Sequence, residues 1–261
     1  MTSSDDFGSS GVVSVRVGAD RAVSNHGQLA RALGSEILAG RYPPGTNMPS
    51  EGDLLARFGV SRTVLREVMK TLAAKGLVSS KTRVGTRVSD PVHWNLFDAT
   101  VLSWRVSLGF DEAFRRELLE IRRLVEPRAA ELAALRRDPA DVAKLRGLIE
   151  RMGAPGHSRR SFAEADLDFH LEVGVASGNT LMRSLAGVIE TALIASFTLS
   201  SPTESLELQA ENVRNHENIV DAIEAGDPQA ASQAMLHVIE AGAVRIEAAD
   251  TMRAAAGALT L

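Results

Sequence analysis

Hydrophobic positions recur every three or four residues along most of the chain, which predicts a mainly α-helical protein. The pattern is clearest over residues 111–250, where Pro and Gly breaks separate about six predicted helices. We expect these helices to form an all-helical antiparallel bundle. They are predicted over residues 111–136, 139–152, 159–177, 179–200, 204–225 and 228–248.

Residues 27–90 carry a different pattern, in which three short helices are followed by two short strands. The helices are expected to begin near Gln28, after Ser50 and at Ser61, and a tight turn containing glycine joins the second to the third. The strands flank a basic tip at residues 81–83. This order of elements predicts an N-terminal winged helix-turn-helix domain.

Three segments lie outside these two domains. Residues 1–26 are rich in Ser, Gly and Asp, and we expect a disordered tail. Residues 91–110 contain both tryptophans and are too apolar for a free linker, so we expect a connector that packs between the domains. Residues 251–261 are expected to be a frayed tail.

Charge separates the two domains. Residues 27–90 hold 10 basic and 5 acidic residues, whereas residues 91–261 hold 17 basic and 25 acidic residues. A small basic unit joined to a larger acidic one is consistent with nucleic-acid contact by the first. The absence of cysteine excludes disulfides, thiol nucleophiles and Cys-ligated zinc. No apolar run is long enough to span a membrane and no secretory signal is present, so we expect a cytoplasmic protein.

The third predicted helix has a polar side that suits DNA. Short hydroxyl side chains and guanidinium groups at a helix N-terminus can meet phosphate, and arginine can bind guanine with two hydrogen bonds. The residues on this side are Ser61, Arg62, Thr63 and Arg66. From charge alone, an ordinary solvated basic surface explains them equally well.

Residues 43–88 resemble the DNA-binding domain of the GntR family of bacterial transcription regulators. The motifs PPG, PSE, GVSRTVLRE, L-x-x-KGL and GT-x-V occur in the order and spacing of that family. The resemblance implies DNA contacts by Ser61, Arg62, Thr63, Arg66 and Thr86. Two positions depart from the family pattern: Gly52 stands where arginine is usual, and Arg83 stands where the wing usually has glycine.

Four potential metal ligands border the apolar faces of three predicted helices. Asp166 and His170 are four residues apart and therefore share a face, while His216 and His237 each flank a stripe on a later helix. Imidazole and carboxylate groups suit zinc, nickel, manganese or iron. Spacing alone leaves open that each histidine is separately satisfied.

Residues 117–240 resemble the FCD ligand-binding domain of the FadR subfamily. The matching pieces include Asp166-x-x-Phe169-His170, His216-x-x-Ile219 and Ala234-Met235-x-His237. The resemblance implies that one acidic residue and three histidines hold a divalent cation, with zinc preferred over nickel, manganese or iron. Those positions fall on Asp166, His170, His216 and His237. Members that bind acyl-CoA lack this set, so a fatty-acyl effector is not expected.

Arg122 is the candidate effector-binding residue. Its position beside an apolar stripe suits a pocket edge, where a guanidinium binds carboxylate with two hydrogen bonds. A snorkelling arginine or an intramolecular salt bridge is the alternative. In the resembling domain this helix contributes to the effector pocket, and the connector is similar to that of sugar-acid-responsive repressors, especially those that respond to galactonate.

These features predict a ligand-responsive transcription regulator, a repressor, that binds double-stranded operator DNA as a homodimer. The expected effector is a small carboxylate, a sugar acid such as galactonate or a related aldonate. One alternative is a metal-sensing regulator, in which the cation itself is the signal. A metal-dependent enzyme is not expected, because Glu164 and Glu172 point away from the cluster and no nucleotide-binding loop is present.

Overall fold

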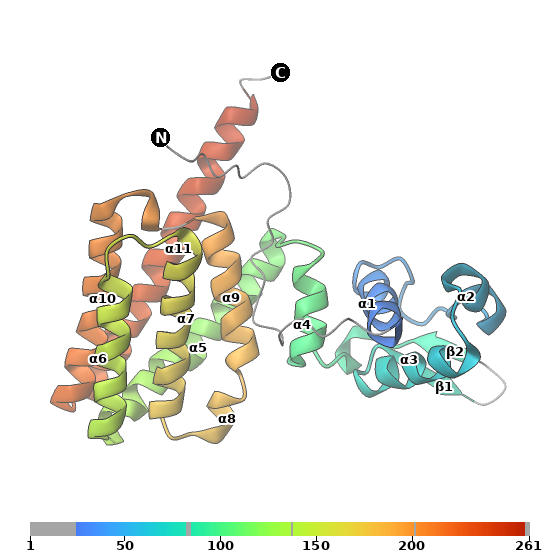
Figure 1. Cartoon of the computed structure of the whole chain (residues 1–261), viewed down its shortest axis with the longest axis horizontal. Coiled ribbons are helices and arrows are strands. Elements are labelled where there is room, and N and C mark those ends of the chain that lie inside the picture. Colours follow the sequence, from blue (N-terminus) through green and yellow to red (C-terminus); the bar gives the residue numbers. More distant parts are fainter. Residues whose placement is uncertain (1–24, 82–84, 137, 201, 259–261) are drawn as a thin grey trace. The chain divides into compact units, whose positions relative to one another are not determined.

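The computed structural model describes residues 25–81, 85–136, 138–200 and 202–258. Contacts divide the chain after Phe110 into two compact units (Figure 1). Both units are mainly helical, and the described residues contain a single sheet of two strands. The predicted fold class is therefore confirmed. Among the described helices, none is long and apolar enough to cross a membrane.

The first unit folds as a winged helix-turn-helix. Ser50 caps the second helix by accepting a hydrogen bond from the backbone N–H of Asp53, whose carboxylate accepts one from the backbone N–H of Ser50. Gly59 has a φ of 63° and ends that helix in a left-handed conformation. The elements of the first unit are α1 (Asn25–Leu38), α2 (Glu51–Phe58), α3 (Arg62–Ala74), β1 (Val78–Lys81), β2 (Gly85–Val88), η1 (Pro91–His93) and α4 (Ala99–Val106).

The wing is an antiparallel hairpin in which Val78 lies opposite Val88 and Lys81 lies opposite Gly85. Val78 and Val88 are buried, so the base of the hairpin is anchored in the core of the unit. The predicted basic tip consists of Lys81, at the end of β1, and of residues 82 and 83, which lie outside the described residues.

The predicted connector packs into the core of the first unit. Trp104 is only 4% exposed, and its ring fills the space beside Gly34, where an added Cβ would lie 2.3 Å from ring atoms. The Nζ atom of Lys75 donates a hydrogen bond to Oδ1 of Asp98 at 2.6 Å. Trp104 therefore finds its apolar surroundings on α1, within the first unit, and the expected packing of the connector between the domains stays a prediction.

The second unit is a helical bundle. In Figure 1, helices α6, α7, α9 and α10 stand side by side, and α5 and α11 run obliquely to them. Its elements are α5 (Glu112–Arg136), α6 (Pro139–Gly153), α7 (Arg159–Ala176), α8 (Thr180–Arg183), α9 (Ala186–Leu199), η2 (Pro202–Glu204), α10 (Leu206–Ala225) and α11 (Pro228–Ala258). The largest fully buried side chains of its core are Leu145, Met152, Phe162, Phe169, Ile219, Ile223, Met235 and Ile239.

Two predicted helices differ from those observed. The segment predicted as one helix over 179–200 forms α8 and α9, and Asn179 caps α8 with its side-chain oxygen. The last helix continues to Ala258, so the prediction of a frayed tail is wrong for residues 251–258. Alanine has the highest helix propensity, and this stretch is rich in it.

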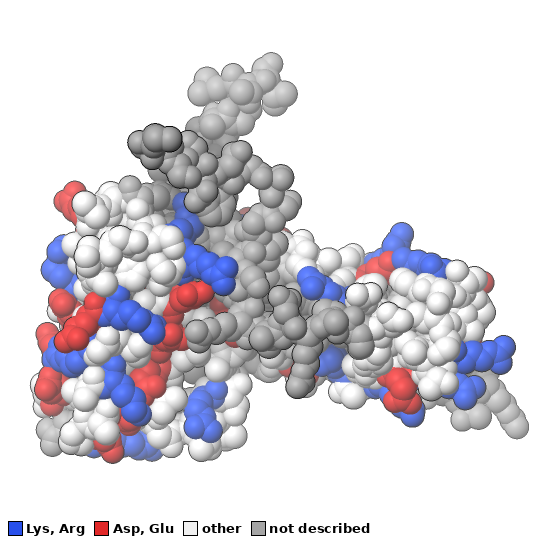
Figure 2. Space-filling view, viewed as in Figure 1, with Lys and Arg blue, Asp and Glu red and all other residues white. Residues whose placement is uncertain are grey.

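The visible face of the second unit carries interspersed acidic and basic side chains (Figure 2). Helix α6 forms ion pairs here with α7, through Arg151 and Asp168 at 2.6 Å, and with α10, through Arg146 and Asp221 at 2.7 Å. Exposed pairs of this kind contribute about 1 kcal/mol or less. We interpret this face as an ordinary solvated surface, and the acidic excess of the unit forms no single patch on it.

Candidate functional site

Helix α7 carries two ligand-type side chains into the core of the second unit. Asp166 and His170 are one helical turn apart, on the same side as the buried residues Phe162 and Phe169. Helix α10 contributes His216, which is completely buried. These three residues form the only cluster of metal-ligand type found among the described residues, and we call it the Asp166–His170–His216 cluster.

The ligand atoms of this cluster converge. Nε2 of His216 lies 3.2 Å from Oδ1 of Asp166, Nε2 of His170 lies 3.6 Å from Oδ2 of Asp166, and the two Nε2 atoms are 3.4 Å apart. Ligand atoms about 2.1 Å from a tetrahedral zinc ion stand about 3.4 Å from one another. The three distances, of which the two to Asp166 end on different carboxylate oxygens, therefore agree with this separation to about 0.2 Å.

The second nitrogen of each imidazole has its own partner. Nδ1 of His216 lies 2.7 Å from the backbone oxygen of Asn212, in a hydrogen bond. Nδ1 of His170 lies 2.5 Å from Oε2 of Glu126, in an ion-pair contact that lacks hydrogen-bond alignment. Both partners are acceptors, so they favour the tautomer that carries the proton on Nδ1 and the lone pair on Nε2. Phe169 packs edge-on against both rings and excludes water from one side.

Glu126 extends the cluster to helix α5. Its Oε1 accepts a hydrogen bond from Nε of Arg122 at 2.5 Å, and both side chains are buried. Burial by itself would raise the pKa of Glu126, but the charge of Arg122 and the contact with His170 lower that pKa to about 2. Burial likewise opposes ionisation of Asp166, but the interactions with His216, His170 and Arg122 together outweigh it and lower the pKa of Asp166. Both carboxylates are therefore ionised at neutral pH.

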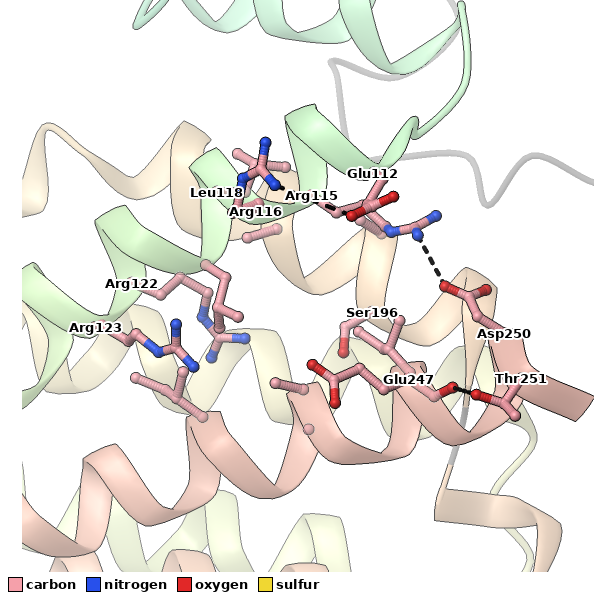
Figure 3. A pocket seen from close by; sticks show the side chains of 17 residues that line it. Glu112, Arg115, Arg116, Leu118, Arg122, Arg123, Ser196, Glu247, Asp250 and Thr251 are labelled. Atoms are coloured by element: carbon pink, nitrogen blue, oxygen red, sulfur yellow. Dashed lines mark hydrogen bonds and ion pairs between the residues drawn. The ribbon is translucent and has the colours of Figure 1, made fainter.

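A cavity of about 500 Å³ lies among α5, α9 and α11 (Figure 3). Arg122 lines this cavity and, through Glu126, also contacts the Asp166–His170–His216 cluster. Two other arginines of the lining have acidic partners: Arg115 pairs with Asp250 at 2.8 Å and Arg123 with Glu240 at 2.7 Å. The polar side chains of the lining are Glu112, Arg115, Arg116, Arg122, Arg123, Ser196, Glu247, Asp250 and Thr251.

The predicted DNA-contact residues are found at the start of α3 and on β2. Arg62, Thr63 and Arg66 are exposed on the helix. The hydroxyl of Ser61 caps the helix by accepting a hydrogen bond from the backbone N–H of Val64. On β2, the Thr86 hydroxyl lies 3.1 Å from the hydroxyl of Ser80. The α3 residues thus form one exposed surface, with Thr86 on the wing.

Comparison with known proteins extends these observations. Residues 25–88 match the bacterial regulatory proteins of the gntR family, and residues 117–241 match the FCD domain. The galactonate operon transcriptional repressor of Escherichia coli K12 is 32% identical over 220 residues, which cover 84% of this chain and 96% of that protein. The chain belongs to the GntR family of bacterial transcription regulators.

Other relatives agree with this assignment. The uncharacterized regulator YieP of Escherichia coli K12 is 35% identical to this GntR-family protein over 79% of the chain and 88% of its own length. The probable D-xylose utilization operon repressor of Paenarthrobacter nicotinovorans is 32% identical, over 79% and 81%. The solved structure of Lar, which controls expression of the Listeria monocytogenes agr system, shares the fold, with a TM-score of 0.60 at 18% identity over 87% of this chain and 99% of Lar. GntR-family proteins are DNA-binding regulators and not enzymes, as predicted.

This GntR-family regulator does not bring all four predicted metal ligands together. His237 is exposed, whereas Met235 and Val238 fill the inward face of α11. At about 100° per residue, His237 lies on the side of the helix opposite Met235. The prediction of His237 as a fourth ligand is therefore corrected, and the cluster consists of Asp166, His170 and His216.

Two charged residues beside the cluster were not predicted. Glu126 follows Arg122 by four residues, a spacing that places both on one helix face, so its role could have been anticipated. Arg245 is half-buried, with Nη2 3.7 Å from the position of a Cβ on Gly242. Burial lowers the pKa of Arg245, although the charge of Asp166 acts in the opposite direction. Its guanidinium has no hydrogen bond or ion pair with the residues that the structure describes.

Proposed function

We propose that this regulator holds a divalent metal ion on Asp166, His170 and His216 and binds a small carboxylate there. Binding of the carboxylate changes the affinity of the regulator for operator DNA. The main support for this proposal is that Nε2 of His170, Nε2 of His216 and the carboxylate of Asp166 converge in the buried core. Lone pairs at this separation repel each other unless a proton or a metal ion lies between them, and a metal ion can at the same time bind the Asp166 carboxylate.

The donor set favours a first-row transition metal. Two imidazoles and one carboxylate suit zinc, and nickel, manganese and iron are compatible with the same ligands. Calcium and magnesium prefer oxygen ligands and are disfavoured. When bound, the metal supplies positive charge and coordination positions that the protein leaves open.

The open positions support an acidic effector. A carboxylate together with a neighbouring hydroxyl offers oxygen atoms that suit these metals. Arg122 lines the adjoining cavity, and the half-buried Arg245 adds a second positive charge. Galactonate or a related aldonate has this chemistry, and one relative is a galactonate operon repressor.

The first unit supplies the operator contacts. We propose that Arg62 and Arg66 read base edges in the major groove, that Ser61 and Thr63 contact phosphate, and that Thr86 contacts DNA from the wing. A homodimer presents two such surfaces to a pseudo-palindromic operator and acts as a repressor.

Elemental analysis and gel-shift titration of the purified protein test the proposal together. We expect one transition-metal ion per chain, and operator affinity that falls when galactonate or another aldonate is added. A protein that binds no metal from a zinc-containing buffer would contradict the metal site. Operator affinity that follows zinc concentration without any organic acid would favour the metal-sensing alternative.

A further inference from the structure

A continuous series of buried contacts joins the cavity to one of the metal ligands. Arg122 lines the cavity and donates to Oε1 of Glu126, while Oε2 of Glu126 lies 2.5 Å from Nδ1 of His170. The side chains of all three residues are at most 7% exposed. We call this series the Arg122–Glu126–His170 relay.

Glu126 has two partners that compete for its negative charge. A carboxylate that accepts the Nδ1 proton of a metal-binding histidine makes Nε2 a stronger ligand. The same carboxylate is drawn toward the guanidinium of Arg122, which reduces its pull on that proton. The strength of the hydrogen bonds from Arg122 to Glu126 therefore determines how strongly His170 can bind a cation.

Arg122 is also suited to sense an anion. A guanidinium has five N–H donors, and Glu126 uses those on Nε and Nη2. The neighbouring cavity arginines Arg115 and Arg123 are paired with carboxylates of α11. An anion that enters the cavity can therefore bind Arg122. The only partner of Arg122 among the described residues is Glu126, the carboxylate that contacts His170.

We propose that Glu126 is a positioning residue that transmits the state of Arg122 to His170, so that an anion engaging Arg122 strengthens the hold of His170 on the metal. The proposal rests on the proposed metal site. In such a relay the effector strengthens metal binding and the metal strengthens effector binding, because coupling between two sites is reciprocal. Glu126 itself contacts neither the metal ion nor the effector.

Metal titration without any effector tests the relay. Zinc affinity is measured by competition with a chromophoric chelator for the wild-type full chain and for Glu126→Gln, Arg122→Gln and the double variant. Thermal unfolding without metal confirms that each variant is folded. Arg123→Gln is the matched control, because it removes the neighbouring charge of the same helix and cavity without touching Glu126.

The relay predicts effects of opposite sign. Glu126→Gln lowers zinc affinity about 10- to 100-fold, the range seen when supporting partners of metal ligands are lost. Arg122→Gln frees Glu126 and raises the affinity several-fold, whereas Arg123→Gln leaves it nearly unchanged. In the Glu126→Gln background, Arg122→Gln has no further effect, since its route to the metal is already broken. The absorption spectrum of bound cobalt(II) should shift in Glu126→Gln, reporting the altered His170 ligand.

Three results would overturn the relay. The first is a zinc affinity of Glu126→Gln equal to that of the wild type. The second is a lower zinc affinity of Arg122→Gln, which is expected if Arg122 only stabilises the fold. The third is an effect of Arg122→Gln that persists in the Glu126→Gln background, which is expected if Arg122 acts on the metal by charge repulsion. A wild-type protein that binds no zinc contradicts the proposed function instead, so the two failures are distinguishable.

Discussion

The two units place their key arginines in opposite environments. Arg62 and Arg66 are exposed at the start of α3, whereas Arg122 is buried and hydrogen-bonded in the bundle. An exposed arginine can be replaced at little cost to folding, but a buried charge is tolerated only with its partners in place. In the first unit function is separable from stability, and in the second unit the same side chains serve both.

The contrast between buried and exposed side chains can be tested most strongly on two histidines of the second unit, the buried His216 and the exposed His237. His216→Ala removes a cluster ligand and should lower zinc affinity more than about 100-fold, beyond the loss typical of supporting residues. His237→Ala should leave zinc affinity within about 2-fold, because His237 is exposed on the far side of α11. Chelator competition measures both. Equal losses in the two variants would mean that α11 faces the cluster differently.

Trp104 tests whether stability in the first unit depends on the connector. Trp104→Ala removes a large buried side chain and should lower the unfolding free energy of this unit by about 3–5 kcal/mol. Denaturant unfolding followed by far-UV circular dichroism measures the change. Zinc affinity is the control and should be retained, because the ligands belong to the second unit. A loss below about 1 kcal/mol would show that the connector is not part of this core.

Arg66→Ala should separate function from stability. We expect a loss of about 1–3 kcal/mol in operator binding, with unfolding free energy changed by about 0.5 kcal/mol or less. Fluorescence anisotropy on an operator obtained by in vitro selection measures the affinity. Arg31→Ala, which removes an exposed charge of α1, is the matched control for the general electrostatic contribution. Similar losses in both variants would argue against base contact by Arg66.

The first unit was predictable because its signals are local. Ser50 with Asp53, Gly59 and Ser61 mark helix ends within a few residues of sequence, and the structure uses each of them in that role. Trp104 was recognised as too apolar for a linker. Its neighbour Gly34 is 70 positions away, so no local pattern could show where the ring packs.

The metal cluster was only partly predictable for a different reason. Asp166 and His170 share a helix with a clear apolar stripe, so their direction followed from spacing. Helix α11 is rich in alanine on several sides. A stripe of Ala234, Val238 and Ala241 would place His237 beside the core, but of these three only Val238 is buried, and Met235 completes the inward face. A helix without one dominant apolar face does not reveal from its sequence which side is buried.

Acid titration of Asp98 gives the smallest of the expected effects and sharpens the contrast within the first unit. Asp98 caps α4 and accepts a hydrogen bond from Lys75. Burial opposes its ionisation, but the hydrogen bond and charge of Lys75, together with the backbone N–H groups of Val101 and Thr100, lower the pKa of Asp98 below its usual 3.8. Its contribution is therefore complete above pH 4 and is lost as the pH falls through the lowered pKa.

Asp98→Asn should accordingly cost about 1–2 kcal/mol of unfolding free energy at pH 7, because it removes the charge that Lys75 and the helix end stabilise. Urea unfolding at pH 7 and at pH 3 measures the difference between wild type and variant. The difference should shrink at pH 3, which lies below the usual pKa of 3.8, because the stabilisation that comes from the lowered pKa is lost in that direction. A difference that stays constant would show that the cap depends on the shape of the side chain and not on its charge.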